Sequence, residues 1–296
     1  MRDKRNADSV ARILNSAGYF RGKARLADAL GRLASYWKHG CGTFSLDGGR
    51  AISIDLNDRV QRLMWGGAYE PHVRNCLVAI LHPGDTFVDI GAHIGFFSLL
   101  AASLVGNTGK VYAFEANANV FQKLQANASE YPWLAASLRA IWSESGQVAF
   151  SDPQQPGETG WGKLTAIRNE GHVVSVEAIT LDEWHMSVGT PGIRAMKIDA
   201  EGSEPFILDG ARRLIARTRP IMIIELNDQL LREVKRSKEA VLARLRDDGY
   251  LVFPIGSDRS KNLANASNLL SPEVLCLPSE RIAESRNMLS RLGIEA

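Results

Sequence analysis

Residues 84–95 read GDTFVDIGAHIG, and this stretch decides the fold. Its apolar part, residues 86–90, predicts a buried strand, and Gly91 and Gly95 follow with three residues between them. The glycines predict a tight turn and a helix that begins close to a ligand. Downstream, the chain repeats this alternation of apolar strands and helices. Strands are predicted at 110–115, 137–142 and 194–199, a helix follows the last of these to about residue 216, and another helix is predicted at 229–246. Such a pattern predicts a doubly wound α/β fold with a mostly parallel sheet, whose ligands bind beyond the carboxyl ends of the strands.

The turn departs from the G-x-G-x-x-G fingerprint of a dinucleotide site, because a third glycine is missing. Asp89 lies at the turn, where its carboxylate would repel a phosphate and attract a cation. The next predicted strand ends in Glu115, twenty residues after Gly95, and an acid at that distance suits the hydroxyls of a ribose. S-adenosylmethionine carries a sulfonium, an amino group and a ribose without a phosphate. We therefore expect this cofactor rather than a nicotinamide dinucleotide, since an ordinary strand–turn–helix would explain the glycines alone.

Candidate catalytic residues follow two later apolar segments. Asp199 and Glu201 end one of them, and Glu225 and Asn227 end the next. Asp199 is the first candidate for a general base or for a partner of the cofactor amine, followed by Glu225 and Glu201. Asp199, Glu225 and Asn227 also offer oxygen ligands of the kind that Mg²⁺ or Ca²⁺ prefers, and this alternative stays open. Lys197, in the middle of its strand, is expected to be a buried ion-pair partner.

Three segments together resemble the FkbM-type S-adenosylmethionine-dependent methyltransferases. They are residues 84–128, TLDEW at 180–184 and MKIDAEGSEPFILDGA at 196–211, and the resemblance covers about residues 69–227. It implies a class I, Rossmann-like fold with a seven-stranded sheet whose last strand is antiparallel. It also implies O-methylation of a hydroxyl on a sugar or a secondary metabolite. The family's FEP is FEA here, so Ala116 departs from the pattern but leaves the ribose acid in place.

The resemblance implies cofactor-binding roles for residues at four strand ends. By this resemblance, Ser98 would bind the carboxylate of the cofactor, and Glu115 would bind its ribose. The segment after the third strand would bind the adenine. Whether Trp142 stacks on the adenine or belongs to the core stays open. The predicted cofactor-binding residues are Glu70, Asp89, Gly91, Ala92, His93, Gly95, Ser98, Glu115, Ala116, Ile141, Trp142 and Asp199.

Other functions stay open beside this one. The acceptor group could be a nitrogen or a carboxylate of a small molecule or peptide, and the chain could also be a non-catalytic binding protein with the same fold. We expect a small-molecule or glycosylated metabolite as substrate and no nucleic acid, because no basic–aromatic stripe is present. Residues 153–171, rich in Gly, Pro and Gln, predict a mobile loop that could close over the substrate, with His172 following it.

Two stripes of apolar residues near the N-terminus predict two amphipathic helices. We expect these helices to pack over the main domain or against a second subunit, which would give a homodimer. Residues 1–25 hold seven basic and two acidic side chains, a charge of +5. A solvated helix face explains this charge, and a basic arm for an anionic substrate or a membrane surface is the alternative. The stripes are Val10, Ile13, Leu14 and Ala17, then Leu26, Ala29, Leu30 and Leu33.

The domain organisation follows from these segments. Residues 1–41 are expected to form an N-terminal helical extension, and residues 42–296 the Rossmann-like methyltransferase domain. Within the latter, residues 43–56 alternate apolar and polar side chains on both sides of Asp47-Gly48-Gly49, which predicts a hairpin.

Composition bounds the class of protein. The chain has 296 residues, 45% of them hydrophobic, and a net charge of +2, which excludes a disordered or fibrous protein. Its three cysteines are widely spaced and predict buried thiols in a reducing compartment. A signal peptide is not expected, because residues 1–20 lack an uninterrupted apolar core. A membrane span is not expected either, because the most apolar window holds Asp89 and His93. We therefore expect a cytoplasmic protein.

Overall fold

The computed structural model describes residues 2–18, 20, 22–45, 51–152, 163–165, 172–256 and 272–294. Most of the predicted loop at 153–171, the side chain of His172 and the tip of the predicted hairpin lie outside the described residues.

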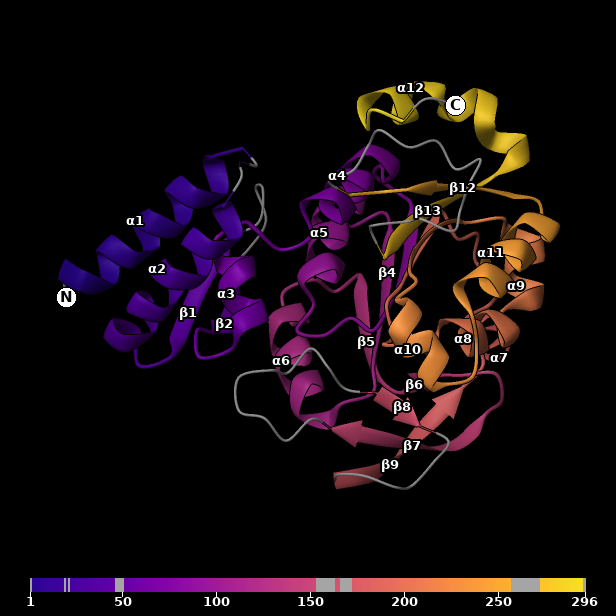
Figure 1. Ribbon diagram of the computed structural model, residues 1–296, viewed down its shortest axis with the longest axis horizontal. Helices are drawn as coiled ribbons and strands as arrows, with labels where there is room; N and C mark the ends of the chain where they lie inside the picture. Colours follow the sequence, from indigo (N-terminus) through magenta and orange to yellow (C-terminus); the bar gives the residue numbers. More distant parts are fainter. Residues whose placement is uncertain are drawn as a thin grey trace.

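Seven strands form the central sheet, in the order β12-β13-β11-β10-β3-β4-β5 (Figure 1). β13 is antiparallel to both of its neighbours, β11 and β12, and the other pairs in the sheet are parallel. This arrangement confirms the predicted seven-stranded sheet with one reversed, final strand. The strands are β3 (Thr86–Ile90), β4 (Lys110–Glu115), β5 (Leu134–Leu138), β10 (Ala195–Ile198), β11 (Ile221–Glu225), β12 (Tyr250–Pro254) and β13 (Glu273–Pro278).

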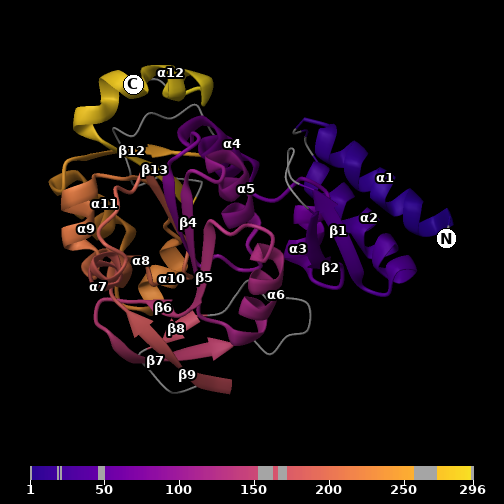
Figure 2. The ribbon, with the colours of Figure 1, turned by 180° about the vertical axis from the view of Figure 1, so that it is seen from behind.

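Helices cover both faces of this sheet, and Figure 2 shows the same three layers from behind. Each face buries its own cluster of aliphatic and aromatic side chains, as a doubly wound sheet requires. On one face lie α4 (Pro71–Ile80), α5 (Phe96–Val105) and α6 (Ala118–Ala128), with α12 (Ile282–Arg291) and the short helix η2 (Ser279–Arg281) at the edge. On the other lie α7 (Leu181–Ser187), α8 (Glu204–Asp209), α9 (Arg212–Thr218), α10 (Asp228–Glu233) and α11 (Lys238–Asp247).

Two helix predictions are wrong in the same way, because the structure has two short helices in each place where the sequence predicts one. The helix expected after β10 is α8 and α9, divided at Gly210, where a Cβ would lie 2.2 Å from the carbonyl oxygen of Trp142. The helix expected at 229–246 is α10 and α11, divided near Lys235, which has a φ of 57°. Ser237 then begins α11 by accepting a hydrogen bond from the backbone N–H of Ala240.

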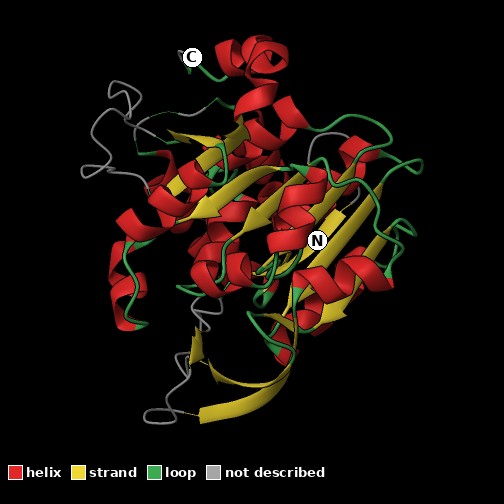
Figure 3. Cartoon of the chain, turned by 90° about the vertical axis from the view of Figure 1, so that its right-hand side faces the viewer, coloured by secondary structure: helices red, strands yellow, loops and turns green. Residues whose placement is uncertain are grey.

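A second sheet that the sequence analysis does not foresee stands beside the first, at the bottom of Figure 3. Its order is β6-β9-β7-β8. The single strand predicted at 137–142 is wrong, since β5 ends at Leu138 in the central sheet, whereas Ala140 and Ile141 pair with β9. The strands are β6 (Ala140–Ile141), β7 (Gly146–Asp152), β8 (Lys163–Thr165) and β9 (His172–Ile179).

The N-terminal elements lie together, next to α5 and α6 (Figures 1 and 2). The predicted hairpin is confirmed as an antiparallel pair. It docks on α6, where the Asn127 side chain exchanges two hydrogen bonds with the backbone of Ser53. The boundary that we place at residue 41 stays a prediction. These elements are α1 (Arg2–Ser16), α2 (Lys23–Lys38), β1 (Cys41–Ser45), β2 (Ala51–Asp55) and α3 (Arg59–Trp65).

The apolar stripe predicted for the second of these helices is not the face that α2 buries. Leu26 and Leu33 are 41% and 47% exposed, whereas the buried residues of α2 are Lys23, Ala27, Gly31 and Ala34. The reason is the close approach of α3, since a Cβ on Gly31 would lie 2.8 Å from the Arg62 side chain. In α1, Leu14 is buried as expected, but Ile13 is 67% exposed.

Two further expectations concern thiols and membranes. The three cysteines are free, but only Cys76 and Cys276 are buried, so the prediction of a buried thiol is wrong for Cys41 in the first strand of the hairpin. Among the described residues, every helix is too short or too polar to cross a bilayer.

Candidate active site

A cavity of about 240 Å³ lies at the carboxyl ends of β3, β4, β10 and β11. The strand order reverses between β3 and β10, and ligands of open α/β sheets bind at such a switch point. Of the predicted site residues, those that line the cavity are Glu70, Gly91, His93, Glu115, Ala116, Ile141, Asp199, Glu201 and Glu225. Five others lie outside this lining, namely Asp89, Ala92, Gly95, Ser98 and Trp142.

Gly91 sets the shape of the floor of the cavity. It has a φ of 77°, which favours glycine, and a Cβ there would lie 1.7 Å from the carbonyl oxygen of Asp199. The following turn is also left-handed, with His93 at a φ of 52° and Gly95 at 93°. Burial lowers the pKa of His93 to about 4, so its ring is neutral at physiological pH. Gly91, for which the sequence predicts a tight turn, therefore allows the ends of β3 and β10 to come into backbone contact.

Glu115 ties the turn after β3 to the end of β4. Its Oε2 accepts a hydrogen bond of 2.9 Å from the backbone N–H of His93, and its Oε1 one of 2.8 Å from that of Asn117. Burial nevertheless raises the pKa of Glu115 to about 7, because these two bonds offset desolvation only in part. The carboxyl group thus has a fixed position at the wall of the cavity, where a ligand with hydroxyl groups would meet it.

Asp89 and Ser98 lie beneath the turn rather than in the cavity. The Ser98 hydroxyl donates to Asp89 Oδ2 at 2.5 Å, and both side chains are fully buried. Ser98 therefore supports Asp89, and this placement leaves it out of reach of a carboxylate in the cavity. Asp89 lies beside Lys197 in the register of β3 and β10. Burial raises the pKa of Asp89, and the Lys197 charge offsets part of this rise. The second carboxylate oxygen of Asp89 has no hydrogen-bond partner within the described part of the chain.

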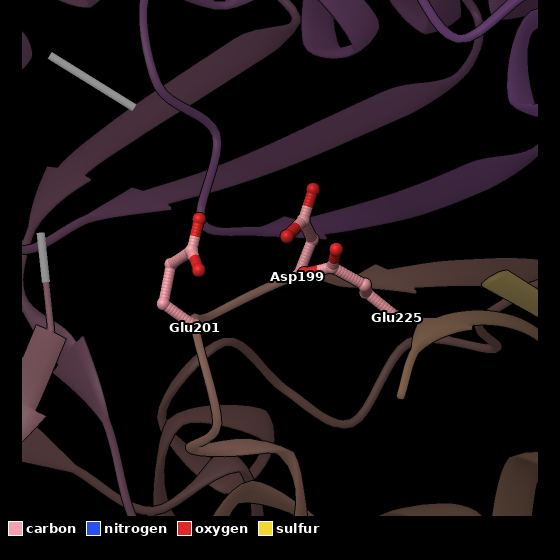
Figure 4. A group of neighbouring side chains, drawn as sticks. All are labelled: Asp199, Glu201 and Glu225. Carbon is pink, nitrogen blue, oxygen red and sulfur yellow. The ribbon is translucent and has the colours of Figure 1, made fainter. Parts of the chain in front are cut away.

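Three carboxylates converge at one end of the cavity (Figure 4). Asp199 and Glu201 come from the loop after β10 and Glu225 from the end of β11, and one oxygen of each lies within 4.8 Å of the others. The expected ion pair of Lys197 is confirmed, because its Nζ lies 2.6 Å from Asp199 Oδ2. Parallel strands that end at the same edge of the sheet thus bring these groups together, as predicted from the sequence.

The protonation of this cluster is uneven. Burial alone would raise the pKa of Asp199, but Lys197 and a hydrogen bond from Glu225 hold it below its usual value. Burial and the Asp199 charge raise the pKa of Glu225 to about 11. Asp199 is therefore an ionised acceptor at neutral pH, while Glu225 is a neutral carboxylic acid that donates to it.

The donors at this place do not fit a divalent metal ion. Asn227, one of the three expected ligands, uses its side-chain oxygen to cap α10 by accepting from the backbone N–H groups of Gln229 and Leu230. Glu225 keeps its proton, which it donates to Asp199. Because one expected ligand caps a helix and another is protonated, we derive no step through a metal.

Glu70 faces the same end of the cavity from another element. It precedes Pro71 at the start of α4 with a φ of 36°, a left-handed conformation that aims the side chain away from the helix. The Tyr69 hydroxyl forms a hydrogen bond with it. Burial raises the pKa of Glu70 to about 7, in spite of the nearby Lys197 charge. Glu70, like Glu115, thus exchanges its proton close to physiological pH.

Glu204 holds the loop that carries Asp199 and Glu201. Its Oε1 accepts hydrogen bonds of 3.0 and 3.2 Å from the backbone N–H groups of Ala200 and Gly202. Glu201 has a φ of 49°, so the loop is strained at the residue that faces the cavity. The contacts of Glu204 are therefore structural.

At the opposite end of the cavity, the second sheet supplies residues that the sequence analysis missed. Arg139 and Phe150 line the cavity there, and Val60 of α3 lines it from the N-terminal part. Trp142 instead stacks on Phe206, with ring centroids 4.3 Å apart, so the alternative of a packing residue fits its placement. No motif marks Arg139 or Phe150, because only the pairing of the second sheet brings them to the site.

The strand order, with β13 reversed between β11 and β12, is that of class I methyltransferases, the S-adenosylmethionine-dependent enzymes of Rossmann-like fold. An acid-rich cavity at the switch point suits their cationic cofactor. Sequence comparison refines the class to a family. The chain belongs to the methyltransferase FkbM domain family, whose model matches residues 89–252, as the resemblance implied.

The chain is also similar to individual proteins. It is 26% identical over 192 residues to the hexuronic acid methyltransferase AglP of Haloferax volcanii, covering 62% of this chain and 76% of the relative. A crystal structure of methyltransferase FkbM from Methylobacillus flagellatus KT matches with a TM-score of 0.42 and 14% identity, over 74% of this chain and 54% of that one. Aeropyrum pernix fibrillarin, solved with S-adenosyl-L-methionine, matches with a TM-score of 0.42 and 11% identity, over 80% and 82%.

Proposed function

We propose that this protein transfers a methyl group from S-adenosylmethionine to a hydroxyl group of a sugar or a sugar-like metabolite. The observation that carries the proposal is the charge of the cavity. Among the described residues, five acidic side chains line it, against one lining arginine and the buried Lys197 beneath it. Glu225 stays protonated, but the ionised Asp199 and the partly ionised Glu70 and Glu115 favour a cation and repel phosphate. The lining acids are Glu70, Glu115, Asp199, Glu201 and Glu225.

Residues around the two strand ends would hold the cofactor, which supplies an electrophilic methyl group on a sulfonium. Gly91 and His93 would form the floor beneath it, and Glu115 would accept hydrogen bonds from the ribose. Asp199, ionised and adjacent to Gly91, is the natural partner of the cofactor's positive charge. We therefore assign Asp199 to cation binding, the second of the two roles expected from the sequence.

Glu70 is the better candidate for the general base. An effective base has a pKa near the working pH, and Glu70 has one of about 7. Asp199 is too weak a base because Lys197 stabilises its charge, and Glu225 already holds a proton. As the oxygen–methyl bond forms, the acceptor hydroxyl would give its proton to the Glu70 carboxylate. Tyr69, hydrogen-bonded to Glu70, would keep that carboxylate in place.

The acceptor class rests on two supports. AglP, a relative over 62% of the chain, is named for hexuronic acid, which supports a sugar as the acceptor. A hydroxyl group of such a sugar is neutral, so the acidic side chains of the cavity do not repel it. Methylation of a carboxylate is the second candidate, because Arg139 lines the cavity beside β6. Arg139 is 3.0 Å from Glu177, and both side chains are exposed enough to part for an anionic substrate.

One experiment tests both the reaction and its acceptor group. The protein is incubated with methyl-labelled S-adenosylmethionine and a panel of hexoside and hexuronoside acceptors, and the products are treated with mild alkali. We expect label on a hexose or hexuronic acid that alkali does not release, since ethers are stable there and esters are not. Release of the label as methanol would instead establish carboxyl methylation. Absence of cofactor binding in calorimetry would refute the proposal as a whole.

A further inference from the structure

Helix α2 carries its large apolar side chains on the outside. Amphipathic helices of globular proteins ordinarily bury such residues and expose small or polar ones. In α2 the buried face consists of Ala27, Gly31, Ala34 and the stem of Lys23, while Leu33 is 47%, Trp37 41% and Tyr36 81% exposed. An apolar face that a protein leaves outside in this way is typical of a binding surface.

The orientation of α2 is set by specific contacts with α3. Arg62 of α3 is buried and donates through Nε to Asp28 at 2.7 Å, and through Nη1 to the carbonyl oxygens of Leu56 and Asn57. On the same side, Ala27 packs against Gly66 so closely that a Cβ there would lie 2.3 Å from it. Turning the helix to bury its leucines would break this ion pair and force both backbones apart.

The exposed residues form one continuous strip, which we name the outer face of α2. It consists of Leu26, Ala29, Leu33, Tyr36 and Trp37, which lie three, four and seven positions apart and are therefore neighbours on the helix surface. Among the described residues, ten large apolar side chains are exposed, and four of these belong to the outer face of α2.

The surroundings of this face are basic. Arg25 and Arg32 are exposed and lie one turn from Ala29, on the edge of the strip, and Arg32 also pairs with Asp28 at 3.0 Å. Helix α2 as a whole holds four basic residues against this single acid. A helix with leucine and aromatic side chains on one strip and arginines along its edge has the composition of an interfacial helix, which lies in the headgroup region of an anionic bilayer. Two copies of this chain would instead oppose like charges across the same face.

We propose that the outer face of α2 docks the protein on an anionic lipid bilayer. The leucines and Trp37 enter the boundary between headgroups and acyl chains, while Arg25 and Arg32 contact lipid phosphates. The helix lies along the surface and does not cross it. This inference is independent of the proposed methyl transfer, because it concerns a surface outside the cavity.

The test is co-sedimentation of the full chain with vesicles of phosphatidylcholine alone or of phosphatidylcholine mixed with phosphatidylglycerol. We expect binding to the mixed vesicles and little to the neutral ones. Raising the salt to about 0.5 M weakens the binding, because screening reduces the attraction to anionic lipid.

Two variants separate the apolar and the basic contributions. Leu33→Ser with Trp37→Ser weakens binding to mixed vesicles at least about tenfold, since two apolar side chains no longer leave water. Arg25→Glu with Arg32→Glu does so by about the same factor through loss of the charge attraction. The matched control is Leu138→Ser with Met186→Ser, two residues of similar exposure on the methyltransferase domain, and it binds like the unchanged protein. Thermal unfolding confirms that all three variants fold.

Several outcomes would overturn the inference. One is failure to bind mixed vesicles at low salt, and another is equal binding by the folded Leu33→Ser/Trp37→Ser variant. A third is a dimer in light scattering that this variant converts to a monomer, which would make the outer face of α2 an interface between two copies of the chain.

Discussion

The backbone of Gly91 touches the backbone of Asp199, so closely that a Cβ on the glycine would lie 1.7 Å from the carbonyl oxygen of the aspartate. The two residues are more than a hundred positions apart and follow the neighbouring strands β3 and β10. Their contact places the Asp199 carboxylate beside the turn on which we expect the cofactor to lie. The position of Asp199 thus depends on residue 91 being a glycine, which has no side chain.

Gly91→Ala is therefore expected to damage the site more than backbone strain alone would. The new methyl group must push the loop after β10 away, which moves Asp199, and we expect cofactor affinity to fall at least about tenfold. Calorimetry with S-adenosylmethionine measures this. The control is Gly189→Ala, which has a similar φ of 81° but no atom within 4 Å of a Cβ. Equal affinity of both variants would show that the contact does not position Asp199.

Removal of the Lys197 ammonium is expected to destabilise the fold. Lys197→Met keeps the length of the side chain but leaves Asp199 ionised in a buried place, with Asp89 beside it. Breaking a buried ion pair from one side costs about 3 kcal/mol in free energy of unfolding, measured by urea denaturation. The double variant Lys197→Met/Asp199→Asn regains most of this loss, because the uncompensated charge is gone. A single variant as stable as the unchanged protein would contradict this account.

How far the sequence predicts this site depends on the kind of contact involved. Periodic apolar runs and the rule that parallel strands end at one edge are enough to bring Asp89, Lys197, Asp199 and Glu225 together, and β3 and β4 have the predicted bounds. These inferences need only local pattern and the regular geometry of a sheet. The same acids also indicate the class of cofactor, because their carboxylates repel a phosphate group.

The remainder depends on contacts between segments whose pairing no local pattern encodes. Arg139 and Phe150 reach the cavity only because β6 and β7 join a second sheet through β9. The orientation of α2 follows from the room that Gly31 leaves for Arg62, against the preference of its leucines. The proposal of Glu70 as the base has a similar origin, since its pKa depends on burial and on Tyr69 rather than on a motif.

Glu70→Gln is expected to reduce kcat by at least about a hundredfold, the usual contribution of a positioned base. Glu70 acts in its ionised form, so kcat of the unchanged enzyme at saturating S-adenosylmethionine rises with pH and levels off above a pKa of about 7. The cofactor is saturating because Glu115, whose pKa is also about 7, would otherwise titrate in the same range. In Glu70→Gln this rise disappears. Glu225→Gln serves as control, because Glu225 stays protonated in this range and its replacement leaves the rise in place. Retention of the full pH dependence by Glu70→Gln would assign the proton transfer to another group.

Glu204→Gln is expected to stabilise the protein at alkaline pH and not at acid pH. Burial raises the pKa of Glu204 to about 7 from an ordinary value of 4.5, so the folded state holds a proton that the unfolded state has released. The stability from this proton is fully present below pH 4.5 and is lost as the pH rises through 7. A glutamine keeps the oxygen that binds Ala200 and Gly202 without ever ionising. At pH 8 the variant should therefore gain roughly 2 kcal/mol in urea denaturation, and at pH 5 little. The exposed acid Glu239, in the first turn of α11, provides the control Glu239→Gln, for which no such difference between the two pH values is expected. A Glu204→Gln variant with the same relative stability at both pH values would mean that Glu204 is ionised in the folded protein.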